Sequence, residues 1–72
     1  MANSRAVSIS DHELWACAQK VIDMHRTNAE LHAAMRADEL LEAGDLDGQR
    51  VWMAILERIE QWRSDRLPLL LQ

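Results

Sequence analysis

Residues 10–13, Ser-Asp-His-Glu, carry a complete helix-start signal. In this pattern the Ser10 hydroxyl accepts a hydrogen bond from the amide of Glu13, and the Glu13 carboxylate accepts one from the amide of Ser10. Side chains suited to a buried face then recur at three- and four-residue spacing: Leu14, Cys17, Ala18, Val21, Ile22 and His25. The sequence therefore predicts an amphipathic helix over about 11–26, preceded by a flexible N-terminus over 1–9.

A second helix is predicted over about 28–43. Residues 27–30, Thr-Asn-Ala-Glu, repeat the capping pattern, and they follow the first helix so closely that the chain must turn sharply near Thr27. Gly44 is expected to end this helix, because glycine readily adopts the left-handed conformation common at helix C-termini. The predicted buried face is rich in alanine, which lets neighbouring helices approach closely: Ala33, Ala34, Ala37, Leu40 and Leu41.

A third helix is predicted over about 46–66. Asp45 is the expected N-cap, and the helix should end before Pro68, because proline disfavours helical geometry in the residue before it. Its predicted buried face comprises Gly48, Val51, Trp52, Ile55, Ile59 and Trp62. Gly48 is expected to make a close contact with the second helix.

These patterns predict an all-α fold, a compact three-helix domain over 10–66 followed by an apolar, leucine-rich tail over 67–72. A domain of this size buries only about 60% of its unfolded surface. The chain has three tryptophans and neither phenylalanine nor tyrosine, so the tryptophans are expected to supply most of the large core volume: Trp15, Trp52 and Trp62.

Composition excludes several classes of protein. A single cysteine rules out an internal disulfide, and no apolar run approaches the roughly 18 residues of a membrane span. The N-terminus does not have the pattern of a signal peptide, so a cytoplasmic location is expected. The net charge is −4, with one arginine against six acidic residues in 28–48, and no cluster of basic residues suits a nucleic acid.

No metal or cofactor site is expected. The three histidines, His12, His25 and His32, lack the paired spacing of zinc ligands. Residues 45–48 faintly resemble part of a calcium loop, but Ala54 stands where that loop needs a glutamate.

Catalysis is not expected either. Cys17 lies near Lys20 and His25 in the sequence, yet it falls on the predicted buried face, where cysteine behaves as a small hydrophobic residue. The helix faces assemble no set of nucleophile, base and orienting group.

Two surfaces are candidates for binding a partner. His32, Met35, Arg36 and Glu39 form a mixed exposed stripe, which is either a solvated face with an Arg36–Glu39 pair or a recognition patch. Leu69, Leu70 and Leu71 either fold back onto the chain's own core or insert into a groove on a partner or a second copy.

Three blocks of the sequence occur in order at fitting distances: Glu13-Leu14-Trp15-Ala16-Cys17-Ala18, His32-Ala33-Ala34-Met35-Arg36-Ala37-Asp38 and Gly44-Asp45-Leu46-Asp47-Gly48, with Trp52 following. Over roughly Ile9 to Trp62 the chain resembles a family of short uncharacterised proteobacterial proteins. The resemblance implies a small helical fold and no established activity or catalytic residue.

The functional hypothesis is a non-enzymatic protein–protein interaction module with an accessory or regulatory role, self-associating as a homodimer. The alternative is a small acidic inhibitor or antitoxin-like protein that covers a basic surface of another protein. The acidic residues of 28–48 separate the two, because neutralising them should affect only the second.

Overall fold

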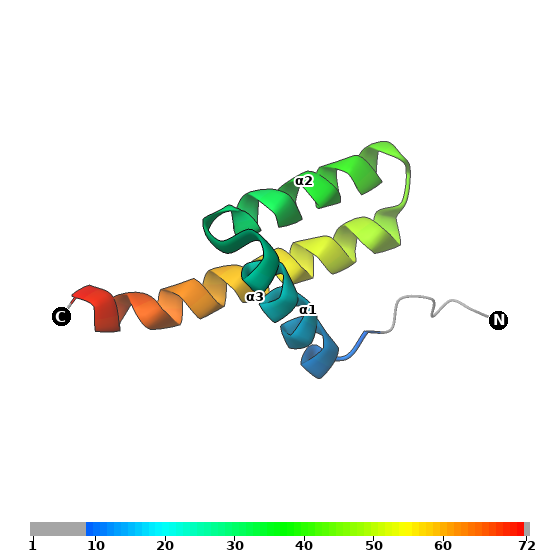
Figure 1. The fold of residues 1–72 in the computed structure, drawn as a ribbon. Helices are drawn as coiled ribbons and strands as arrows, with labels where there is room; N and C mark the ends of the chain where they lie inside the picture. The colour runs from blue at the N-terminus through cyan, green and yellow to red at the C-terminus, as the bar shows by residue number, and fades with distance from the viewer. Residues whose placement is uncertain (1–8, 72) are drawn as a thin grey trace.

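The computed structural model describes the backbone of residues 9–71 and the side chains of residues 9–66. Four helical elements follow one another: α1 (Asp11–His25), the short 3₁₀ helix η2 (Arg26–Asn28), α2 (Ala29–Glu42) and α3 (Leu46–Leu71). Helices α2 and α3 form an antiparallel hairpin, and α1 crosses α3 (Figure 1). The described part of the chain contains no strand, so the prediction of a compact all-α fold is confirmed. Of the predicted flexible segment 1–9, only Ile9 lies within the described residues.

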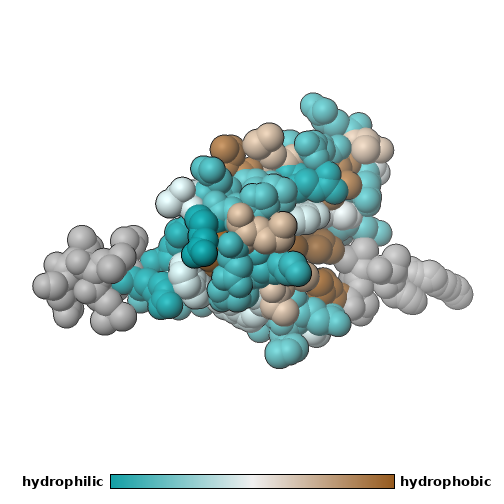
Figure 2. Space-filling view, in the orientation of Figure 1, coloured by the Kyte–Doolittle hydropathy of each residue, from teal (hydrophilic) through white to brown (hydrophobic). Residues whose placement is uncertain are grey.

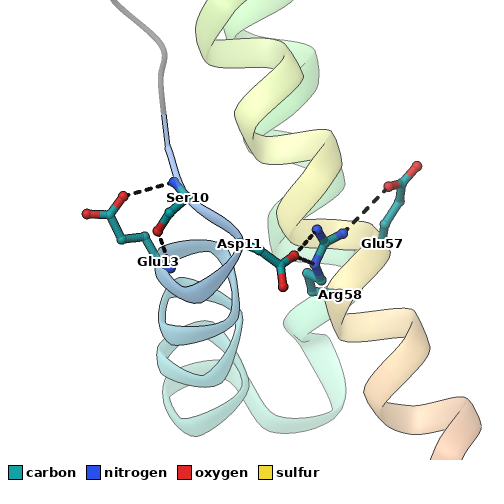
Figure 3. A network of polar contacts seen from close by, with 5 residues as sticks. All are labelled: Ser10, Asp11, Glu13, Glu57 and Arg58. Carbon is teal, nitrogen blue, oxygen red and sulfur yellow. Dashed lines mark hydrogen bonds and ion pairs between the residues drawn. The ribbon is translucent and has the colours of Figure 1, made fainter.

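Helix α1 begins as predicted. The amide of Glu13 donates to Ser10 Oγ at 3.1 Å, and the amide of Ser10 donates to Glu13 Oε1 at 3.0 Å (Figure 3). This reciprocal pair satisfies two backbone groups that a helix N-terminus leaves without partners. Ile9, just before the cap, packs against the core.

The corner between α1 and α2 is as sharp as predicted, but the second capping box does not form. Arg26 adopts a positive φ of 52°, and the 3₁₀ turn makes Asn28 the residue before α2, with no side-chain cap. Glu30 instead pairs with Arg63 of α3, with 2.5 Å between its Oε2 and the arginine Nε. The prediction of a cap at Thr27 was wrong, because Thr27 lies inside the 3₁₀ helix and the Glu30 carboxylate is paired with Arg63.

The turn between α2 and α3 follows its local signals. Gly44 has a φ of 81°. Its amide donates to the Leu41 carbonyl at 3.0 Å, and the Asp45 amide donates to the Leu40 carbonyl at 2.8 Å, which together form a Schellman motif. Asp45 Oδ1 then accepts from the amide of Gly48 at 2.9 Å, which caps α3. A Cβ at Gly48 would lie 2.6 Å from the Asp45 carboxylate. The closest contact of Gly48 is therefore with its own cap, and the contact expected with α2 stays a prediction.

The core is thin and rich in alanine. Its buried side chains are Leu14, Ala18, Val21 and Ile22 of α1, Ala29, Ala33 and Ala37 of α2, and Ile55 and Ile59 of α3. The small residues of α2 let the hairpin helices approach closely. Ile59 is 0% exposed and is the largest side chain that is fully buried.

The tryptophans lie at the edge of the core, which corrects the prediction that they would fill it. All three are half-buried, because closely packed helices leave no room for an indole between them. Each ring has an arginine guanidinium over it: Arg58 over Trp15 at 5.8 Å, Arg36 over Trp52 at 5.8 Å and Arg66 over Trp62 at 4.2 Å.

Helix α3 ends later than the sequence predicted, at Leu71 rather than near Arg66. Proline at 68 removes one backbone hydrogen bond, and the backbone nonetheless continues in helical geometry through Leu71. With 26 residues against 14 in α2, α3 is about 18 Å longer at about 1.5 Å per residue, and it continues past the rest of the molecule in Figure 1. The side chains of the candidate residues Leu69, Leu70 and Leu71 lie outside the described residues.

Candidate functional site

An open groove of about 690 Å³ lies where α1 meets α2 and α3. Nine residues from the three helices line it: Ala16, Cys17, Lys20, Val21, Met24, His25, His32, Trp52 and Ile55. Its volume falls within the roughly 300–1,000 Å³ of ligand-binding clefts, and like them it combines apolar walls with a few polar groups.

The second half of α1 supplies most of the wall. Cys17, Val21 and Met24 follow one another at three- and four-residue spacing, so they form one stripe along the helix. Cys17 is a half-buried free thiol. Met24 is 66% exposed, which makes it the most exposed large hydrophobic residue of the described chain. The groove thus has an apolar rim that the described residues leave uncovered.

A pair of stacked histidines forms one end of the groove. The rings of His25 and His32 lie 3.9 Å apart between centroids and are within 15° of parallel. The edge of His32 also meets the Trp52 ring at 5.6 Å. The sequence placed His32 on an exposed face, which was wrong: the tight corner at Arg26 brings the last turn of α1 against the first turns of α2 and half-buries the ring.

This setting lowers the pKa of His32 below its ordinary value. Burial disfavours the charged form most, and the nearby His25 and Arg36 repel a proton further. Glu39 acts in the opposite direction but does not outweigh them. His32 therefore favours the neutral form more than an exposed histidine does.

The predicted stripe on α2 divides into two parts. Arg36 and Glu39 form the expected ion pair at 2.6 Å, and Arg36 also lies over the Trp52 ring at 5.8 Å. His32 and Arg36 thus face α3 and the groove, whereas Met35 remains 52% exposed on the outer side.

The groove brings Cys17, Lys20 and His25 to one wall, as their sequence spacing allowed. Among residues 9–66, however, no hydrogen bond joins the Cys17 thiol to a histidine or lysine. In the same part of the chain no three histidine, cysteine, aspartate or glutamate side chains lie together as metal ligands. What the groove offers chemically is apolar surface with cationic groups at its edge.

Ion pairs to α3 hold both of the other long helices, one at the start of α1 and one at the start of α2. At the start of α1, Arg58 Nη2 lies 2.5 Å from Asp11 Oδ1, and Glu57 approaches Arg58 at 4.0 Å (Figure 3). Near the corner, Arg63 pairs with Glu30 and donates to the carbonyl of Arg26. Except for Glu57–Arg58, these contacts join residues far apart in the sequence, and no local pattern predicts them.

The fold and groove define a small all-α domain in which a helical hairpin and a crossing helix enclose an apolar cleft. The chain belongs to the family of unknown function DUF6961, whose profile matches residues 10–66. That match spans α1, η2, α2 and most of α3. Comparison with curated proteins and with solved structures gave no match. Within residues 9–71, no helix has the length and apolar character needed to cross a membrane.

Proposed function

We propose that the chain is a non-enzymatic protein–protein interaction module, self-associating and cytoplasmic, with an accessory or regulatory role. The observation that carries the proposal is the apolar groove at the junction of the three helices, with Met24 exposed on its rim. Methionine, tryptophan and arginine are enriched in protein interfaces; Met24 and Trp52 line this groove, and Arg36 lies over the Trp52 ring.

The energetics of a chain this small support self-association. A core of this size rarely provides more than roughly 3–5 kcal/mol, and a chain with one cysteine gains nothing from an internal disulfide. Burying one exposed methionine or leucine contributes about 1.5–3 kcal/mol, so covering the groove adds stability comparable to that of the core.

Two alanines provide a matched test. Ala16 lines the groove and is exposed, so Ala16→Arg places a charge at its mouth without disturbing the core. Ala43→Arg makes the same change at the exposed C-cap of α2, away from the groove. In the wild-type chain and in each alanine variant, Met24 is replaced by the photocrosslinker p-benzoylphenylalanine, and the proteins are expressed in the native host. Met53, which is exposed on another face, is the control position for the crosslinker.

The proposal predicts an adduct from position 24 to one defined segment, of this chain or of another protein, identified by mass spectrometry. The adduct should vanish with Ala16→Arg and persist with Ala43→Arg. Equal crosslinking from positions 24 and 53, or none from position 24, would refute the groove as a binding surface.

An acidic inhibitor is the second candidate, favoured by the acidic end of the hairpin. All five carboxylates there are exposed: Asp38, Glu39, Glu42, Asp45 and Asp47. Replacing Glu39, Glu42 and Asp47 by their amides should abolish binding to a basic surface but only weaken binding in the groove, where burial of apolar side chains contributes most. The same crosslinking assay separates the two candidates.

A further inference from the structure

We propose that the groove of one copy receives the outer face of α2 from a second copy, so that two chains form a symmetric dimer. This inference rests on the proposed function and names the partner of the same groove. Three observations support it: an exposed apolar pair on α2, the position of that pair beside the groove, and the opposite charges of the two surfaces.

The apolar pair consists of Leu31 and Met35, which are 59% and 52% exposed. Residues four apart lie one above the other on a helix, so these side chains form a short ridge on the outer side of α2. Figure 2 shows apolar side chains along the outer edge of this helix, surrounded by hydrophilic ones. Within residues 9–66 neither residue belongs to the packed core or its partly buried margin.

The ridge and the groove are neighbours on one surface. Met35 follows His32, which lines the groove, by three residues, so these two side chains are neighbours on the helix surface, and Met24 lines the groove from α1. A two-fold contact uses the same patch on both partners, so each must offer both a projection and a recess. Here one patch contains both, and a two-fold axis beside α2 lets each ridge enter the other groove.

Charge complementarity favours a second copy as the occupant. The titratable groups that line the groove are Cys17, Lys20, His25 and His32, and Arg36 lies over its Trp52 wall. Among residues 9–66, no carboxylate lines it. The ridge continues along α2 into exposed acidic residues, of which Glu39 is paired with Arg36 of its own helix, whereas Asp38 and Glu42 can meet Lys20 of a second copy. An acidic helix end meeting a basic rim stabilises the complex and accelerates its formation.

The test is the double variant Leu31→Glu/Met35→Glu, studied by sedimentation equilibrium at micromolar concentration. Both residues are exposed, so the monomer should fold, which circular dichroism verifies. Met53→Glu introduces the same charge at an exposed methionine outside the ridge and groove. Loss of two buried apolar side chains should raise the dimer dissociation constant by at least about 100-fold, and Met53→Glu should leave it unchanged.

Two outcomes would overturn the inference. A dimer that Ala16→Arg dissociates but the double variant does not would mean that another segment fills the groove, and the proposed function would survive. A wild-type chain that stays monomeric at several hundred micromolar would exclude the second copy as the occupant. The crosslink from position 24 would then decide the proposed function separately.

Discussion

Replacing Ile59 by alanine should remove most of the stability of this chain. Ile59 is 0% exposed and packs within a core whose other members are mostly alanine and medium-sized aliphatic residues. An isoleucine-to-alanine change in a core costs about 2–5 kcal/mol, because the lost burial adds to the cost of the cavity. Since a core of this size supplies roughly 3–5 kcal/mol, the variant should be largely unfolded at 37 °C.

Ile59→Val keeps the effect measurable, because it removes a single methylene and should cost about 0.5–1.5 kcal/mol. In a domain of this size each kcal/mol lowers Tm by roughly 4–8 °C. Urea unfolding, followed by tryptophan fluorescence at one fixed protein concentration, gives the free energy of unfolding of both variants. Met53→Ala, at a position 41% exposed, is the control and should cost less than about 1 kcal/mol. Equal costs for Met53→Ala and Ile59→Ala would refute the assigned buried face of α3.

Three further changes test local features. Arg26→Gly should raise Tm, because a φ of 52° strains a residue with a side chain by about 1–3 kcal/mol, which is more than the entropy cost of glycine. A lower Tm would contradict the corner geometry. Gly48→Ala should not give the gain of about 1 kcal/mol expected inside a helix, because its Cβ displaces the Asp45 cap; a full gain in a urea melt would contradict this. Burial and His25 lower the pKa of His32, so the folded chain resists protonation of this ring more than the unfolded chain does. The neutral ring therefore leaves the fold at full stability above pH 6.5, and that stability is lost as the pH falls through the lowered pKa. Between pH 7.5 and 5.5, wild-type stability should therefore fall more steeply than that of His32→Asn, and parallel urea-melt profiles would refute this.

Features that depend on neighbouring residues were predictable from the sequence. The Ser10–Glu13 capping box, the left-handed Gly44 and the Asp45 cap each require only groups within a few residues, and all three form. Helix positions followed from the spacing of apolar residues, because that spacing decides which face is buried.

Features that depend on distant residues were not predictable. The carboxylate of Glu30 had a local partner in the sequence pattern, but Arg63, 33 positions away, competes for it successfully. The His25–His32 stack, and with it the groove, exists only because the corner folds α1 back onto α2. The spacing of apolar residues shows which side chains lie at the border of a buried helix face. Whether such a side chain is buried or exposed depends on how the neighbouring helix packs against it.

An isotope-filtered NOE experiment on a mixture of labelled and unlabelled chains tests the groove as the binding surface most directly. The filter retains only contacts between different copies, and the Trp52 indole protons report from inside the groove. The proposed dimer predicts intermolecular NOEs from the Trp52 indole to the methyl groups of Leu31 and Met35. Absence of intermolecular NOEs at Trp52, in a sample that sedimentation shows to be dimeric, would contradict the account.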